Sequence, residues 1–153
     1  MSKLEAAERS PDDVERAVAG LSDAVLRYKP APNKWCILEI LAHLADIEIV
    51  YGYRMRQMLA DKEPVIAPID QDDWANNLRY IERPPAESLE LYRAGRNANM
   101  RLLRQVGLAN LDKGAYHPER KATVTVRDAM EMLLGHGPNH LAQIERLKQQ
   151  AKG

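Results

Sequence analysis

Apolar residues recur every three or four positions in four long stretches of the chain, and this spacing predicts four amphipathic helices. The stretches run from about residue 11 to 27, 35 to 60, 86 to 107 and 126 to 149. Residues 61–85 lose the periodicity and are punctuated by prolines. A connection of this length suits a bundle with a long crossover between its second and third helices. We therefore expect an all-α fold, a four-helix bundle in up-down-down-up order.

Local signals set the expected ends of these helices. Ser10-Pro11 should start the first helix, because serine is a good cap and proline suits the first helical position. Gly107 should end the third helix, and Thr125 with Asp128 resembles a capping box at the start of the fourth. Two short elements are also expected, a helix over residues 74–80 and an extended segment over residues 121–124.

Histidines interrupt the apolar sides of two of these helices. His136 and His140 lie in the apolar stripe of the fourth helix, and their spacing of four residues points both rings to one side. His43 lies within the apolar stripe of the second helix. Two distant parts of the chain therefore place imidazoles where a core helix would normally carry leucine.

The fourth helix also contains residues that disfavour a helix, next to its histidines. Gly135, Gly137 and Pro138 lie there, and a proline inside a regular helix costs about 3 kcal/mol. We expect a kink or local bulge at this point, which would aim His136 and His140 differently from a straight helix. Such breaks in local rules tend to mark functional sites.

The central hypothesis is that His43, His136 and His140 converge on a divalent metal ion. Burying close imidazoles without partners costs roughly 1–3 kcal/mol for each unsatisfied group, and a metal ion satisfies them together. Neutral imidazole is a good ligand for zinc, nickel or iron(II). The alternative is that these are core histidines hydrogen-bonded to nearby carboxylates and backbone, and spacing alone leaves both interpretations open.

Other polar residues near the histidines have several interpretations. Glu39, Asp46 and Glu48 could each orient a ligand ring through its second nitrogen, or could be surface charges of the helix. Asp46 is the preferred candidate for orienting a ring, and Glu48 is expected to be a surface charge. His117 lies beside Pro118 in a polar loop and is expected to be solvated.

Sulfur-containing residues are expected to be structural. Cys36 could serve as a fourth ligand or a reactive thiol, but a small buried apolar side chain is the preferred interpretation. The methionines of the two histidine-bearing helices are expected to fill the core: Met55, Met58, Met130 and Met132.

Composition narrows the class of protein. At 153 residues the chain is expected to form a single domain, 1–153. Lys plus Arg and Asp plus Glu both number 22, which argues against a nucleic-acid binder acting through a broad basic field. One cysteine fits a reducing compartment, and no apolar run approaches the length of a membrane span or a signal peptide. We expect a cytoplasmic protein that binds neither nucleic acid nor membrane.

Two motifs resemble those of a known family. Residues 34–48, KWCILEILAHLADIE, resemble the second-helix motif of the DinB-like (DinB/YfiT-like) metalloenzyme superfamily. Residues 135–144, GHGPNHLAQI, resemble its closing motif, in which two histidines precede an Ala/Gly-Gln-Ile segment. The chain departs from the commoner pattern at Gly137, where an acidic residue often follows the first closing histidine, and it also carries Pro138.

The resemblance implies a four-helix bundle, often dimeric, with a divalent metal held by three histidines, here His43, His136 and His140. Relatives include S-transferases that use bacillithiol, mycothiol or glutathione, and a mycothiol-dependent maleylpyruvate isomerase. The expected function is therefore a metal-dependent, thiol-dependent S-transferase or related isomerase. Its partners would be a low-molecular-weight thiol as co-substrate and a small electrophile, and it would act as a homodimer.

Two other functions remain open on the sequence. One is metal-assisted hydrolysis, in which the metal activates water. The other is a non-catalytic, metal-stabilised helical module with a role in the stress response. No catalytic general base and no cofactor-binding residue stands out from the sequence.

Overall fold

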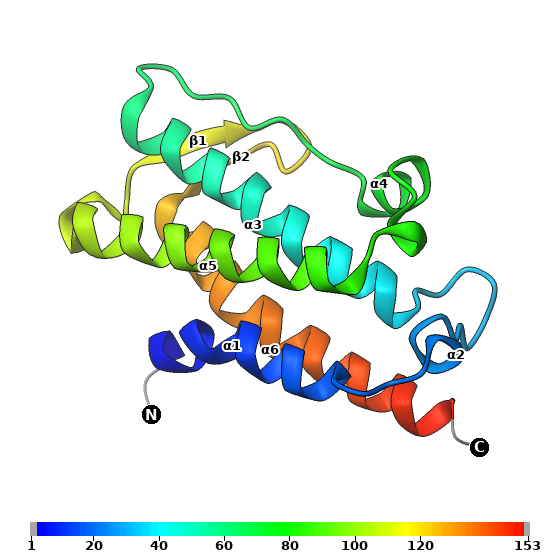
Figure 1. The fold of residues 1–153 in the computed structure, drawn as a ribbon. Helices are drawn as coiled ribbons and strands as arrows, with labels where there is room; N and C mark the ends of the chain where they lie inside the picture. Colours follow the sequence, from blue (N-terminus) through cyan, green and yellow to red (C-terminus); the bar gives the residue numbers. More distant parts are fainter. Residues whose placement is uncertain (1–2, 152–153) are drawn as a thin grey trace.

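Four long helices form the body of the protein in the computed structural model, which describes residues 3–151 (Figure 1). They are α1 (Lys3–Val18), α3 (Ile37–Ala60), α5 (Pro85–Val106) and α6 (Val126–Gln150). In Figure 1, α1 and α6 run in one direction and α3 and α5 run in the opposite direction. The expected up-down-down-up bundle is therefore confirmed. The expected bounds of α3, α5 and α6 are also right to within two residues.

The first helix differs from the expectation. It already includes Lys3 and continues through Ser10 and Pro11, which therefore do not start it. Proline at this position leaves the carbonyl of Ala7 without its helical donor. The buried guanidinium of Arg96 donates to that carbonyl at 3.0 Å, so a residue of α5 replaces the missing hydrogen bond.

The segment after α1 is also not part of one continuous helix. The helix ends at Val18, and Gly20 adopts a positive φ of 72°. A separate single turn, α2 (Asp23–Leu26), follows, and the Ser22 side chain caps it. The expected single helix over 11–27 is wrong because a glycine in the left-handed region ends a helix.

Helix α3 is the central element, and most of its length is buried. Its residues from Ile37 to Glu48 all lie in the interior. One apolar cluster surrounds its first half together with α1 and the end of α6, and includes Val14, Ile40 and Ile144. A second cluster surrounds its last turns. The polar residues of α3 in this stretch must therefore find partners inside the protein.

The long connection between α3 and α5 runs back from the end of α3 toward its first half (Figure 1). It contains a short helix, α4 (Gln71–Asn77), and a 3₁₀ turn, η1 (Tyr80–Glu82), where a helix was expected over 74–80. A two-stranded antiparallel hairpin, β1 (Gly114–His117) with β2 (Ala122–Thr125), lies against this connection through a parallel bridge between Val65 and Tyr116. Strand β2 confirms the extended segment; β1 and the turn η2 (Leu108–Asn110) were not expected.

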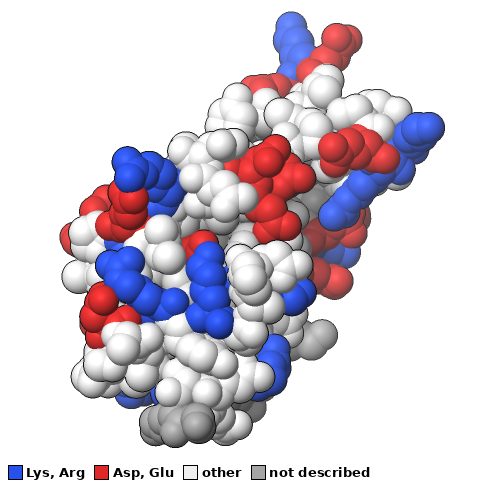
Figure 2. All heavy atoms as spheres, turned by 90° about the vertical axis from the view of Figure 1, so that its right-hand side faces the viewer, with Lys and Arg blue, Asp and Glu red and all other residues white. Residues whose placement is uncertain are grey.

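The start and course of α6 follow from its sequence. Thr125 and Asp128 form the expected capping box. The helix then continues without interruption through Gly135, Gly137 and Pro138. Across residues 3–151 no helix combines the length and apolar character needed to cross a membrane. Basic and acidic side chains are interspersed on the face shown in Figure 2, with no broad basic field there.

Candidate metal centre

Three imidazoles from two helices meet in the interior of the bundle. His43 lies in the first half of α3, and His136 and His140 lie about one turn apart on α6. The Nε2 atom of His136 is 3.0 Å from Nε2 of His43 and 3.2 Å from Nε2 of His140. One ring nitrogen from each residue lies within 4.8 Å of the others. The expected meeting of these three rings is therefore observed.

Hydrogen bonds among the rings cannot satisfy this arrangement well. A neutral imidazole has one N–H donor and one acceptor lone pair, so a single Nε2 atom cannot make good bonds to two neighbours at once. Nε2 of His136 faces both other rings. By contrast, nitrogens bound to one tetrahedral ion at 2.0–2.1 Å lie about 3.3 Å apart. The two separations from His136 therefore suit ligands of one ion, and the nitrogens of His43 and His140 lie within 4.8 Å of each other.

The rings are held neutral, as metal ligands must be. Burial, together with a smaller effect of the neighbouring His140 ring, lowers the pKa of His43 to about 3 and that of His136 to about 2. Burial also lowers the pKa of His140, which a hydrogen bond to Gln143 partly offsets. At neutral pH the ring nitrogens are therefore free of extra protons and can donate lone pairs.

Two residues that sequence reasoning did not assign support the rings. Nδ1 of His140 lies 2.9 Å from Oε1 of Gln143, an acceptor, so Nδ1 carries the hydrogen and Nε2 is left to face the centre. Trp35 packs edge-on against the His43 ring with centroids 4.7 Å apart. The i+3 spacing from His140 to Gln143 was visible in the sequence, whereas the Trp35 contact depends on the fold.

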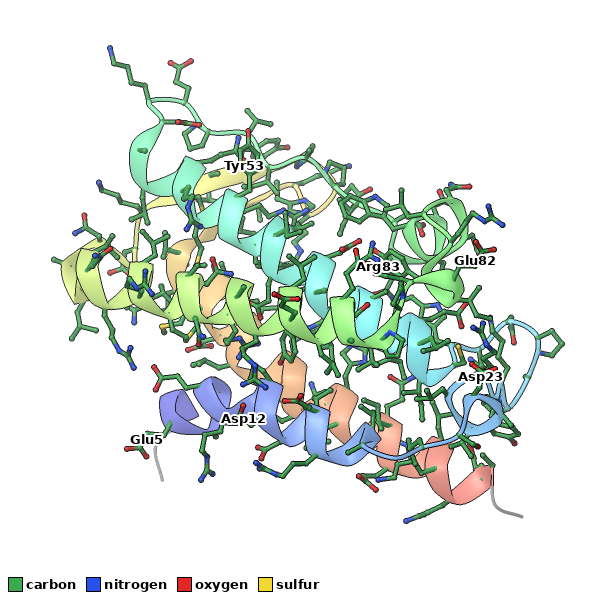
Figure 3. All side chains as sticks on the ribbon, viewed as in Figure 1. Glu5, Asp12, Asp23, Tyr53, Glu82 and Arg83 are labelled. Atoms are coloured by element: carbon green, nitrogen blue, oxygen red, sulfur yellow. The ribbon has the colours of Figure 1, made fainter. Side chains whose placement is uncertain are left out.

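The carboxylates of α3 do not orient the rings. Glu39 accepts a hydrogen bond from the backbone of Cys36 and pairs with Lys29. Asp46 accepts bonds from Tyr80 at 2.6 Å and from Arg83 at 2.7 Å. Figure 3 places Arg83 near the start of α5, beside α3. Among the described residues no hydrogen bond joins Asp46 to an imidazole, so the expectation for Asp46 is wrong.

Glu48 is buried rather than a surface charge. Its carboxylate lies 2.6 Å from a guanidinium nitrogen of Arg96, and both side chains are almost fully inaccessible. It also accepts a bond from Asn99 at 2.8 Å. Burial raises the pKa of Glu48, and the charge of Arg96 opposes that shift. This pair links α3 to α5 and is structural.

His117 is also not the solvated loop residue that was expected. It ends strand β1, is buried, and accepts a long bond from the Arg120 backbone at 3.5 Å. It lines a cleft of about 340 Å³ that also borders His43 and His136. The hairpin therefore brings this histidine to the site instead of leaving it solvated. No spacing rule in the sequence pairs it with the other three.

Packing explains why position 137 is a glycine and not the acidic residue of the commoner motif. A Cβ atom there would lie 1.9 Å from Oγ of Ser10 and 2.4 Å from the hydroxyl of Tyr92. Those two hydroxyls are themselves hydrogen-bonded at 2.9 Å. Gly137 therefore lets α1 and Tyr92 of α5 approach α6 closely.

The sulfur-containing residues are structural, as expected. Cys36 is fully buried at the start of α3, and burial raises the pKa of its thiol. It does not belong to the cluster of possible ligands found among the described residues. Met55 and Met58 lie in the core, and Met130 and Met132 pack against it.

Comparison with known proteins now identifies the family. The sequence profile of the DinB superfamily matches residues 6–144, nearly the whole chain. The chain belongs to the DinB superfamily. The resemblance carried by the two histidine motifs is thereby confirmed.

Relatives of this DinB-superfamily chain are described as hydrolases. "Putative metal-dependent hydrolase YfiT" from Bacillus subtilis (strain 168) is 26% identical over 144 residues, which cover 94% of this chain and 81% of that protein. "Putative metal-dependent hydrolase" from Bacillus pumilus (strain SAFR-032) is 28% identical over 137 residues, covering 90% and 78%. These descriptions favour the hydrolase alternative and give no support to the expected S-transferase.

A solved structure has the same fold. The structure of YfiT from Bacillus subtilis, described as "a probable metal-dependent hydrolase with an unusual four-helix bundle topology", matches with a TM-score of 0.89 at 25% identity. The match covers 97% of this chain and 85% of that one. Its described four-helix bundle agrees with the four-helix bundle seen here.

Proposed function

We propose that this protein is a metal-dependent hydrolase that holds its metal ion through His43, His136 and His140. The observation that carries the proposal is the meeting of three neutral ring nitrogens at separations that suit one ion. The descriptions of the YfiT-like relatives support the same chemistry. Zinc, nickel and iron(II) all accept imidazole ligands, and the proposal extends to any of the three.

Three protein ligands leave coordination positions for water and substrate. A divalent ion held here would supply Lewis-acid chemistry, lowering the pKa of a water molecule and polarising a carbonyl group. The chain itself supplies the rest. Gln143 fixes the tautomer of His140, Trp35 packs on the His43 ring, and the cleft gives a small molecule access to the rings.

The ligand assignment is tested by metal content. Wild-type protein should purify with, or take up, about one equivalent of divalent metal, and His43→Ala should lose most of it because two ligands remain. His117→Asn is the matched control, because His117 borders the cleft but does not belong to the three-ring cluster. Full metal retention in His43→Ala would remove that residue from the site.

The reaction is tested by parallel assays of the metal-loaded protein. Ester and amide panels should show hydrolysis that a chelator abolishes and added metal restores. A panel of electrophiles with bacillithiol, mycothiol or glutathione should show no metal-dependent conjugation. Conjugation without hydrolysis would replace the proposal by the thiol-transfer function. Activity in neither assay would favour a non-catalytic metal-binding module.

A further inference from the structure

The cleft beside the three rings has a basic wall. Besides His43 and His136 it is lined by residues of α3, the long connection and the hairpin. The polar ones are Tyr51, Arg54, Gln71, His117, Glu119 and Arg120. A volume of about 340 Å³ fits a small molecule. The two arginines are not explained by the hydrolase proposal.

Arg54 is a buried cation in the wall of this cleft. Only 9% of its surface is exposed. Its guanidinium donates to the carbonyl of Ala67 at 2.7 Å and lies 5.1 Å from the centre of the Tyr51 ring. Among the described residues it forms no salt bridge with a carboxylate. Arginine is rarely buried unless it is paired. The charge of the exposed Glu119 acts on Arg54 without contacting it, which leaves its guanidinium able to pair directly with an anion from outside the chain.

A second arginine adds to the positive charge of the cleft. Arg120, in the hairpin turn, lines the same cleft, and Glu119 is the only acidic residue in that lining. Two arginines and one glutamate leave a charge of +1 with the imidazoles neutral. An adjoining hollow also borders Asp128, which caps α6. Hydrogen bonds with Thr125 and the charge of Arg120 lower the pKa of Asp128, so this carboxylate is ionised and offsets part of the positive charge of Arg120. The lining of the cleft itself keeps a net positive charge before any metal ion binds, which favours an anionic ligand.

The distance between Arg54 and the rings determines how long a molecule must be to contact both. His43 and Arg54 are eleven residues apart on α3, about 16 Å along the helix axis. Long helical side chains lean back toward the start of the helix, which brings the guanidinium closer to His43 than its Cα. One small molecule can therefore span from the basic wall to the three rings.

We propose that this cleft binds the anionic end of the substrate, a carboxylate or phosphate group, through Arg54 and Arg120. The guanidinium fork matches either group in a bidentate manner. The inference rests on the proposed function, since it places the bond to be hydrolysed at the three histidines. It narrows the substrate class to small anionic esters or amides.

Binding of simple anions to metal-free protein tests this without relying on activity. Inorganic phosphate and glutarate are titrated by calorimetry at pH 7.5 and low salt, where the three rings are neutral and no metal can bind the anions. The wild type should bind at least one probe saturably, and the tighter probe distinguishes phosphate from carboxylate. Arg120→Gln should weaken binding about tenfold, because it removes a charged hydrogen-bond donor.

Matched variants test whether anion affinity follows the charge of the cleft. Glu119→Gln should tighten binding by about twofold, since it removes an exposed negative charge. Arg101→Gln, an exposed arginine on α5 outside the cleft lining, should leave binding unchanged. Arg54→Lys keeps the charge but loses the fork, and should weaken binding about tenfold. If Arg54→Lys fails to fold, the Arg120 and Glu119 variants still decide.

Absence of saturable binding to the wild type would overturn the inference. Equal binding by the wild type, Arg120→Gln and Glu119→Gln would mean an adventitious ion only and would overturn it as well. Arginine-dependent binding without metal-dependent hydrolysis would retain the anion site and reject the hydrolase. If the protein hydrolyses neutral and anionic esters equally well and binds no anion, the hydrolase is retained and the anion site is rejected.

Discussion

The three histidines, of which His43 is buried and His136 and His140 are half-buried, are held in a neutral form, and this affects the stability of the fold at acid pH. The folded-state pKa values of His43 and His136, about 3 and about 2, lie well below the value of about 6.5 for an unfolded chain. Between these limits the unfolded chain binds more protons than the folded one, so the free energy of unfolding falls as the pH falls. Above about pH 6.5 the effect is absent.

The pH dependence is measured by urea unfolding of metal-free protein between pH 8 and pH 5. Below about pH 6 each ring should remove up to about 1.4 kcal/mol per pH unit. In His136→Asn the free energy of unfolding should fall less steeply with decreasing pH than in the wild type, by up to about 1.4 kcal/mol per pH unit. Because both proteins contain the same carboxylates, the difference between their slopes reports the ring alone. Identical slopes for the two proteins would show that the ring is not held neutral in the folded state.

Gly137 is the residue where packing constrains the sequence most tightly. Gly137→Ala should destabilise the protein by about 1–3 kcal/mol, because the new methyl group would overlap Ser10 and Tyr92. Gly135→Ala is the matched control on the same helix. No atom lies within 4 Å of its added Cβ, so it should stabilise α6 by roughly 0.5–1 kcal/mol. Chemical unfolding of both variants checks the pair, and equal effects would contradict the contact.

At the scale of elements, one buried network joins three helices. Arg96 on α5 pairs with Glu48 on α3 and donates to the Ala7 carbonyl that Pro11 leaves free on α1. Ser10 and Tyr92 extend the contact between α1 and α5. The interruption of α1 by proline is therefore compensated by a residue far away in the sequence.

Breaking this network should cost far more than breaking a surface pair. Arg96→Met leaves the Glu48 carboxylate buried and unpaired, so the free energy of unfolding should fall by about 3–5 kcal/mol. Arg127→Met, which removes a largely exposed bridge to Asp112, should cost less than about 1 kcal/mol. Thermal and urea unfolding compare the two. A small loss in both would mean that the network contributes little.

The sequence predicted those elements whose signals are local. The stripes of α3, α5 and α6 and the Thr125 cap are read from neighbouring residues, and those helices were placed correctly. The start of α1 was missed because Pro11 inside a helix depends on Arg96. Strand β1 was missed because only pairing with β2 and the bridge to Val65 gives it order.

For the whole molecule, the site was predictable only in part. The meeting of His43 with His136 and His140 follows from apolar stripes that face one core. The places of His117 and Arg54 on the cleft depend on the hairpin and on the long connection, which carry no periodic signal. The role of Gln143 could have been inferred from its spacing to His140. The single-domain, homodimeric and cytoplasmic expectations stay predictions.

Anomalous diffraction from crystals of the metal-loaded protein, collected at the absorption edge of the bound metal, locates the ion and its ligands in one experiment. We predict one strong peak about 2.0–2.1 Å from a ring nitrogen of each of His43, His136 and His140. A peak at another place, or no peak from protein shown to be loaded, would contradict it.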